Sequence, residues 1–326
     1  MSAQLIQRPR RLRKSSKLRN MLENVHLSSS DFIFPVFIIE GRGHKQGIVS
    51  LPGQYRWSID RLPEVLSEIL EANICGVMLF GVPENKDSIG SENYQEDGIT
   101  QKAIRYFKLN APDLVIFTDV CLCSFTDHGH CGVIEGEEIL NDQTLEILAK
   151  TAVSHARSGA DFVAPSGMMD GMIKEIRFHL DMAGFETVGI MSYAVKYASA
   201  FYGPFREACA SSLKGNRKTY QMNYCNDSRE AKREAKLDEE EGADFLMVKP
   251  ALSYLDVIKD ISSHTNLPVA AYNVSGEYAM VKAAAEKGWI DERSIVIESL
   301  TAMKRAGADV ILTYHALDAC SWLKLN

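Results

Sequence analysis

The sequence has no hydrophobic run that approaches the roughly 20 residues of a membrane-spanning helix. It also shows no apolar segment near its start of the kind that marks a secretory signal. Of the 326 residues, 46% are apolar and 24% are charged, which is the balance of a globular protein in water. We therefore expect a cytoplasmic protein with no membrane partner.

Cysteine pairs of the kind that form a disulfide framework are also missing. The seven cysteines are odd in number, and four of them are scattered along the chain: Cys75, Cys209, Cys225 and Cys320. This spacing excludes the small disulfide-stapled domains of secreted proteins. The other three cysteines lie close together, which suits a reduced protein whose thiols bind a metal.

Nucleotide-binding glycine motifs are lacking as well, since no G-x-G-x-x-G or P-loop pattern occurs. The net charge of −7 argues against nucleic acid as the main partner. Residues 8–19, RPRRLRKSSKLR, are a local exception, because they are strongly basic and nearly free of apolar side chains. Charge alone fits either nucleic acid or a neighbouring subunit. Without interleaved aromatic residues for base stacking, this arm favours an acidic surface of a second copy of the chain.

The most distinctive stretch is TDVCLCSFTDHGHCG, residues 118–132, which contains Cys121, Cys123 and Cys131. Three thiolates so close together favour Zn²⁺, and three protein ligands leave a fourth position open, as in catalytic zinc sites. A closed structural site, completed by His128 or His130, is the alternative that the spacing leaves open.

Apolar runs alternate with helical patterns along the chain. The runs that predict buried strands are residues 31–39, 76–80, 114–118, 162–166, 188–193, 245–250, 267–274 and 310–314. Eight strands alternating with helices predict a (β/α)8 TIM barrel over residues 31–326, preceded by an extended N-terminal arm, residues 1–30. A doubly wound open sheet is the alternative.

A short repeat supports this alternation in the second half of the chain. Gly-Ala-Asp occurs at residues 159–161, 242–244 and 307–309, each time directly before a predicted strand. Glycine ends a helix at low cost because it readily adopts a left-handed backbone conformation. The repeats therefore predict helix-to-strand junctions.

Active-site residues of a TIM barrel lie at the carboxyl ends of its strands and in the loops that follow. Polar residues interrupt the apolar runs at these places: Asp119, Ser166, Lys196, Lys249, Ser275 and Tyr314. Burial and a second nearby ammonium group both lower the pKa of a lysine, and the neutral amine attacks carbonyl groups to form a Schiff base. A single lysine at a strand end is more often a surface residue. Lys249 and Lys196 on adjacent strands, beside a zinc loop, favour the catalytic interpretation.

Residues 201–226, FYGPFREACASSLKGNRKTYQMNYCN, show no clear period. A long irregular segment in a compact domain is usually a lid or a binding loop. Its Arg206, Lys214, Arg217 and Gln221 are suited to hold carboxylates, although a solvated basic loop is the alternative.

Seven motifs, taken in order, resemble those of the 5-aminolevulinate dehydratase (porphobilinogen synthase) family. They are DVCLCSFTDHGHCG, APSGMMDG, MSYAVKYAS, FYGPFREA, FLMVKP, YNVSGEYAM and AGADVILTY. The resemblance runs from about residue 8 to the end of the chain. It implies a (β/α)8 barrel whose arm embraces a neighbour, usually within a homo-octamer. It also implies the condensation of two 5-aminolevulinate molecules into porphobilinogen, with loss of two waters, in tetrapyrrole and heme biosynthesis.

The resemblance further implies roles for residues at the mouth of the barrel. Lys249 matches the lysine that forms the Schiff base with the first substrate, and Lys196 matches the second lysine. Asp119 and Ser166 line the same site, with Asp119 as a candidate proton-transfer group. The three clustered cysteines match the ligands of the zinc form of the family, whereas other branches replace them and use Mg²⁺ or K⁺.

Substrate contacts follow from the same resemblance. Arg206, Arg217 and Gln221 match residues that hold the carboxylate of the second substrate, while Ser275 and Tyr314 match those on the first.

Glu234 matches the ligand of an allosteric Mg²⁺ away from the active site. A solvated helix glutamate is the alternative at this position. Two other functions remain open at the level of sequence. One is a Schiff-base aldolase on the same barrel with a structural zinc, and the other is a metal-responsive binding protein whose arm contacts nucleic acid.

Overall fold

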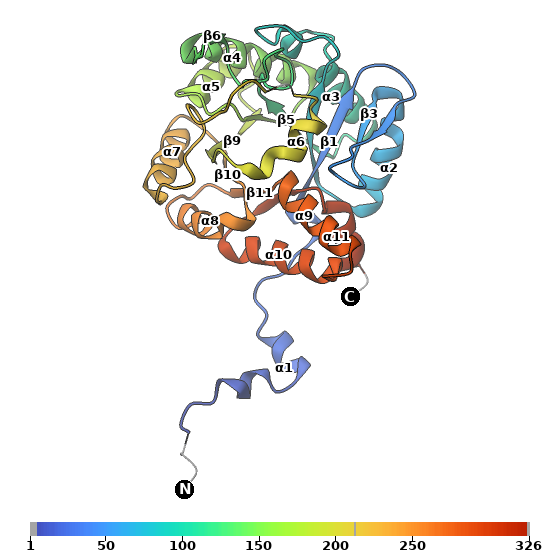
Figure 1. Cartoon of the computed structure of the whole chain (residues 1–326), viewed down its shortest axis with the longest axis vertical. Helices are drawn as coiled ribbons and strands as arrows, with labels where there is room; N and C mark the ends of the chain where they lie inside the picture. Colours follow the sequence, from blue (N-terminus) through green and yellow to red (C-terminus); the bar gives the residue numbers. More distant parts are fainter. Residues whose placement is uncertain (1–4, 212, 325–326) are drawn as a thin grey trace.

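The computed structural model describes residues 5–211 and 213–324, and its centre is a closed barrel of eight parallel strands (Figure 1). In spatial order the barrel strands are β1 (Phe32–Ile39), β4 (Gly76–Val82), β5 (Val115–Val120), β8 (Phe162–Pro165), β9 (Gly189–Lys196), β10 (Phe245–Lys249), β11 (Val269–Asn273) and β12 (Val310–Thr313). The barrel closes because β12 also pairs with β1, with Phe32 opposite Ile311. This pairing confirms the predicted (β/α)8 barrel and rules out the open sheet, whose edge strands would not meet.

Helices follow the strands and cover the outside of the barrel (Figure 1). They are α2 (Leu62–Ala72), α3 (Ile99–Asn110), α4 (Asn141–Ser158), α5 (Met172–Met182), α6 (Gly203–Ala208), α7 (Ser228–Glu240), α8 (Leu255–Ser262), α9 (Ser275–Glu286), α10 (Glu292–Ala306) and α11 (Ala316–Leu323). The remaining strands are short: β2 (Lys45–Gly47) and β3 (Tyr55–Ser58) extend the sheet beside β1, while β6 (Ile134–Glu135) pairs with β7 (Glu138–Ile139). None of the helices in the described residues is both long and apolar enough to cross a membrane.

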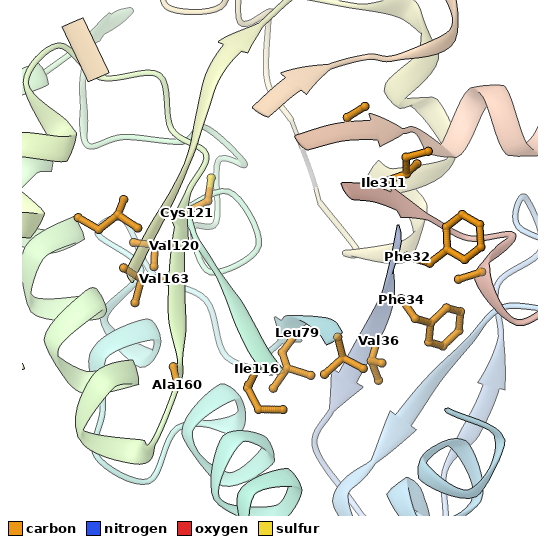
Figure 2. Packing of buried hydrophobic residues seen from close by; sticks show 14 of the residues in the cluster. Phe32, Phe34, Val36, Leu79, Ile116, Val120, Cys121, Ala160, Val163 and Ile311 are labelled. Carbon is orange, nitrogen blue, oxygen red and sulfur yellow. The ribbon is translucent and has the colours of Figure 1, made fainter. Parts of the chain in front are cut away.

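The barrel strands are apolar on both faces because both faces are covered. Successive side chains of a strand point to opposite sides, so one set fills the barrel and the other packs under the helices. Phe37, Met78 and Met247 belong to the inner cluster of buried side chains. Ile116 and Val163 belong to the outer cluster, part of which Figure 2 shows.

The Gly-Ala-Asp repeats form the junctions that the sequence predicts. Gly159, Gly242 and Gly307 end α4, α7 and α10 with φ of 106°, 104° and 120°, where glycine is favoured. The aspartate of each repeat then accepts a hydrogen bond from a backbone N–H of a neighbouring strand. The pairs are Asp161 with Ile116 (2.7 Å), Asp244 with Ile190 (2.7 Å) and Asp309 with Val269 (2.8 Å). The repeat therefore ties the amino ends of adjacent strands together.

The described part of the N-terminal arm projects from the barrel (Figure 1). It contains a short 3-10 helix (Pro9–Arg13) and α1 (Ser16–Met21), neither of which has a buried residue. Met21 is 80% exposed and Ile6 is 88% exposed. The assignment of residues 1–30 to an arm that contacts a neighbouring copy stays a prediction, and residues 1–4 lie outside the described part.

We expect Gly242→Ala to lower the free energy of unfolding by about 1–2 kcal/mol, because a side chain at this φ is strained. Its Cβ would also lie 3.2 Å from Cγ of Arg177. Urea unfolding at fixed protein concentration measures the change. Gly47→Ala is the control, since nothing lies within 4 Å of a Cβ there. Equal urea midpoints for Gly242→Ala and Gly47→Ala would show that the left-handed backbone conformation at Gly242 does not require glycine.

Candidate active site

A cavity of about 320 Å³ opens at the carboxyl ends of the barrel strands. Most of the residues that the sequence singled out line it: Asp119, Cys123, Ser166, Lys196, Arg206, Arg217, Gln221 and Lys249. One wall comes from the lid segment, which we define as residues 201–211 and 213–226. Near its start this segment contains the end of a 3-10 helix (Ala200–Tyr202) and then α6, which lies over the opening of the barrel in Figure 1. The segment is therefore less irregular than its sequence suggested.

Lys249 and Lys196 lie opposite each other at the ends of the paired strands β10 and β9. They are buried, with exposed fractions of 5% and 4%. The register between the strands shifts between Leu246 and Val248, where β9 carries one extra residue. A shift of one residue exchanges the two faces of a strand, so this bulge allows Lys196 to point inward beside Lys249.

Aromatic rings surround the ammonium group of Lys249. The distances from Nζ to the ring centroids are 4.2 Å for Tyr272, 5.0 Å for Tyr193, 5.0 Å for Phe205 and 5.2 Å for Tyr202. Burial in these surroundings, followed by the charge of Lys196, lowers the pKa of Lys249 to about 7. A large fraction of Lys249 is therefore a neutral, nucleophilic amine near neutral pH.

Asp119 and Ser166 complete a polar chain beside the lysines. The Ser166 hydroxyl donates a hydrogen bond to Oδ1 of Asp119 at 2.7 Å, and Nζ of Lys196 donates to the Ser166 carbonyl oxygen. Burial, and then the nearby charge of Cys123, raises the pKa of Asp119 to about 6. A carboxyl group that titrates close to neutral pH is suited to proton transfer.

The thiols of Cys121, Cys123 and Cys131 form a buried cluster, with all three sulfurs within 4.8 Å of one another. Sulfurs bound tetrahedrally to one Zn²⁺ at about 2.3 Å lie about 3.8 Å apart, so small adjustments would let this cluster hold such an ion. Asn93 supports the first of them, because its side-chain amide donates to the carbonyl oxygen of Cys121 at 3.1 Å.

Both histidines of this region have other partners. His128 contacts the Ser88 carbonyl through Nε2 at 3.1 Å and accepts the N–H of His130 on Nδ1 at 3.1 Å. His130 contacts the Lys214 carbonyl through Nε2 at 2.7 Å and the Tyr220 hydroxyl through Nδ1 at 3.1 Å. Within residues 5–211 and 213–324, no fourth histidine, cysteine or carboxylate ligand joins the cluster. This arrangement favours an open site over the closed structural one.

The thiols differ in how easily they lose a proton. Hydrogen bonds from Cys121 and Cys123 lower the pKa of Cys131, and the positive charges of Arg217 and Lys196 act in the same direction. The pKa of Cys121 is raised by its hydrogen bonds with Cys123 and Cys131 and by burial. Buried thiols that bond to one another next to cationic side chains form an environment in which a soft divalent metal can replace protons.

Two residues of the lid segment have buried N–H donors that are free to bind an anionic ligand. Nε of Arg217 and Nε2 of Gln221 are buried and have no hydrogen-bond partner among the described residues. Nη2 of Arg217 donates to the Gly129 carbonyl oxygen at 2.9 Å. Arg206 is exposed at the edge of the same cavity, whereas Lys214, also considered for carboxylate binding, does not line it.

Ser275 and Tyr314 are buried near the cavity but do not line it. The Ser275 hydroxyl donates to the carbonyl oxygen of Phe201 at 3.2 Å and accepts the N–H of Phe205 at 3.0 Å. The Tyr314 hydroxyl lies 3.0 Å from that of Tyr272. Both hydroxyls have protein partners, so the structure gives them a role in holding the lid and the ring around Lys249. Their contact with a substrate carboxylate stays a prediction.

Comparison with known proteins agrees with this geometry. The model of the family described as "Delta-aminolevulinic acid dehydratase" matches residues 6–322. The chain belongs to this family. A relative of that name from Halalkalibacterium halodurans is 57% identical over 317 residues, which cover 97% of this chain and 96% of the relative. Another, from Bacillus subtilis, is 53% identical and covers 98% of this chain and 99% of its own length.

A solved structure extends the likeness to three dimensions. It is the delta-aminolevulinic acid dehydratase (porphobilinogen synthase) of Toxoplasma gondii in complex with the reaction product porphobilinogen. It is similar to this chain with a TM-score of 0.95 and 44% identity, covering 98% of this chain and 92% of that one. Members of the dehydratase family generally depend on a metal, and the three clustered cysteines form a group able to bind one.

Glu234, which the family resemblance connects with Mg²⁺, lies on α7 beside a second cavity of about 370 Å³. Asp170 and Glu230 line the same cavity. Burial, and then the charges of these two carboxylates, raises the pKa of Glu234. The second cavity shares Gln221 with the first, so it is adjacent to the active site. The Mg²⁺ assignment stays a prediction.

Sequence reasoning missed the aromatic residues around Lys249. Tyr193 precedes Lys196 by three positions, and Tyr202 and Phe205 occur in the motif FYGPFREA, but these spacings do not reveal a common centre. Only the closed barrel brings these side chains and Tyr272 around one amine.

We predict that Lys249 reacts with acetic anhydride with an apparent pKa of about 7, below the value of about 10.4 of a free lysine side chain. Peptide mass spectrometry across a pH series measures this. In Lys196→Met the midpoint should move to higher pH, because a neighbouring positive charge no longer opposes protonation of Lys249. Lys236→Met, an exposed change on α7, is the control and should leave the midpoint unchanged. A Lys249 midpoint near 10 in the wild type would overturn the proposed environment.

Proposed function

We propose that this chain carries out the reaction of its family, condensing two molecules of 5-aminolevulinate into porphobilinogen with loss of two waters. The observation that carries this proposal is the pair of buried lysines, Lys249 and Lys196, in register at the mouth of the barrel. The whole-chain family match supports it independently.

The positive charge of the cavity suits the carboxylate of this substrate. Each 5-aminolevulinate molecule carries a carboxylate, a ketone and an amino group. The cationic lining residues are Lys196, Arg206, Arg217, Lys218 and Lys249, while Asp119 is the acidic side chain among those of the described cavity wall. The N–H groups of Arg217 and Gln221 that have no partner among the described residues can donate hydrogen bonds to a carboxylate, and a guanidinium group does so with two parallel bonds.

Lys249 forms the covalent link in the proposed mechanism. Its neutral amine attacks the ketone carbon, and the resulting carbinolamine loses one water to give an imine between Nζ and that carbon. The surrounding rings favour this step because they exclude bulk water and keep the amine unprotonated. Lys196 supplies positive charge beside the reacting centre, and the Asp119 carboxyl moves protons to and from it.

A Zn²⁺ ion held by Cys121, Cys123 and Cys131 would supply a Lewis acid with one open position for an oxygen or nitrogen of the second substrate. The sulfur spacing and the absence of a fourth protein ligand among the described residues support this metal. Cys123 lines the cavity itself, so the ion would face the substrate.

The comparisons do not favour the aldolase alternative, since a whole-chain family model and named relatives point to the dehydratase. The remaining assignments are part of the same proposal. They are a homo-octamer assembled through the arm, Mg²⁺ bound near Glu234, no nucleic acid partner, and a cytoplasmic location.

Incubation of zinc-loaded protein with 5-aminolevulinate should produce a pyrrole that a colorimetric assay detects. Lys249→Met should reduce this activity by at least about 1,000-fold, because no imine forms without the amine. Borohydride should trap one substrate on the wild type but not on this variant, as read by intact mass. Lys236→Met is the control and should behave as wild type. If Lys249→Met were trapped at Lys196 as efficiently as wild type, the roles of the two lysines would be reversed.

Chelation should remove activity without unfolding the protein, and Zn²⁺ added with a reductant should restore it. The reductant matters because free thiols in this cluster oxidise to a disulfide in air. The double variant Cys121→Ala, Cys131→Ala should lose metal binding yet keep its far-UV circular dichroism, since strand pairing holds the barrel. Failure of that double variant to fold would make the metal structural.

A further inference from the structure

The second half of the lid segment is bonded directly to the cysteine loop, which we define as residues 121–131. The contacts are Lys214 N–H to the His128 carbonyl (3.2 Å), Arg217 Nη2 to the Gly129 carbonyl (2.9 Å), His130 Nε2 to the Lys214 carbonyl (2.7 Å), Tyr220 hydroxyl to His130 Nδ1 (3.1 Å) and Cys131 N–H to the Tyr220 hydroxyl (3.5 Å). The second half of the lid segment and the cysteine loop both have irregular backbone structure. Their mutual hydrogen bonds therefore replace those of a helix or a sheet.

Gly129 allows this close approach. Its φ is +74°, and a Cβ placed there would lie 2.8 Å from the backbone N of Leu213 and 2.9 Å from its Cα. Real Cβ atoms do not come so near to backbone atoms, so a side chain at this position would push the lid segment away. The absence of a side chain at Gly129 therefore allows the lid segment to pack directly against the cysteine loop.

Tyr220 stands at the centre of the contact. The Lys214 carbonyl can only accept a hydrogen bond, so the proton of His130 is on Nε2, and Nδ1 accepts the Tyr220 hydroxyl. The same hydroxyl oxygen accepts the backbone N–H of Cys131, a member of the thiol cluster. One phenol therefore connects the backbone of a metal ligand with the lid segment through a directional chain of hydrogen bonds.

We propose that metal binding at the three cysteines and ordering of lid residues 213–221 are coupled, with Tyr220 as the positioning residue that joins them. This inference rests on the proposed metal site. A metal bound to Cys131 restrains the Cys131 N–H and the neighbouring His130 Nδ1, the two groups that bond to the Tyr220 hydroxyl. Because these groups are then already in place, less conformational entropy is lost when the lid segment orders. Coupling of this kind is reciprocal. If the bound metal raises the equilibrium constant for ordering of the lid segment by some factor, the ordered lid segment raises the affinity of the cysteines for the metal by that same factor. The lid carries Arg217 and Gln221, so metal loading also prepares the carboxylate-binding donors.

The test uses Co²⁺ as a spectroscopic probe, because its thiolate charge-transfer absorption reports binding to the cysteines. Chelator-buffered titrations of the metal-free full chain give the affinity. Tyr220→Phe, which removes only the hydroxyl, should bind Co²⁺ about 10-fold more weakly, as expected for a partner of a metal ligand. Tyr55→Phe, a matched change on β3, should bind as wild type. Hydrogen exchange of residues 213–221 should slow on adding Zn²⁺ to wild type and should change little in Tyr220→Phe.

A second variant distinguishes loss of the coupling between metal and lid segment from a general destabilisation of the protein. Gly129→Ala should leave exchange of this segment fast with or without Zn²⁺, while the barrel strands keep their protection. Wild-type Co²⁺ affinity in Tyr220→Phe, together with metal-dependent protection equal to wild type, would overturn the coupling and leave the zinc site intact. Failure of the wild-type chain to show the Co²⁺–thiolate absorption would instead overturn the metal site, and the coupling with it.

Discussion

The pairing of β1 with β12 is the constraint on which the site depends. It involves only two register pairs, Phe32 with Ile311 and Ile33 with Leu312, yet it turns an open sheet into a barrel. In an open sheet, Asp119 on β5 and Lys249 on β10 would be separated by two intervening strands. Closure places the carboxyl ends of all the strands around one opening, so that side chains more than 100 residues apart share one cavity.

The interior that closure creates has electrostatic consequences. Two buried ammonium groups side by side are unfavourable in a medium that screens charge poorly. The surroundings of Lys249 and Lys196 offset this with the Asp119 carboxyl, the Ser166 carbonyl oxygen and the aromatic rings. Deprotonation of Lys249 relieves the remaining repulsion. Burial, together with the repulsion between the two ammonium groups, therefore lowers the pKa of Lys249, and its neutral amine is the nucleophile in the mechanism that we propose.

The two ends of the barrel are built differently. At the amino ends of the strands, three short Gly-Ala-Asp junctions bond one strand to the next with side-chain carboxylates. At the carboxyl ends, the lid segment and the cysteine loop are irregular and hold each other through hydrogen bonds. This division agrees with the general rule that one face of a TIM barrel maintains stability while the other carries chemistry. It also explains why Ser275, although in a motif at the mouth, bonds to the lid backbone.

The sequence by itself determined the strands, the junctions and the types of the candidate catalytic groups. Strand positions follow from continuous apolar runs, and the clustered cysteines lie close in the chain, so both patterns are local and can be read without a fold. The tertiary structure alone decided what those groups face. Contacts between distant segments decide four features. They are the bulge that turns Lys196 inward, the rings around Lys249, the hydrogen bonds of His128 and His130 to groups other than the thiols, and the second cavity beside Glu234. Local periodicity carries no information about such contacts, because strand register and close packing select them only after the barrel has closed.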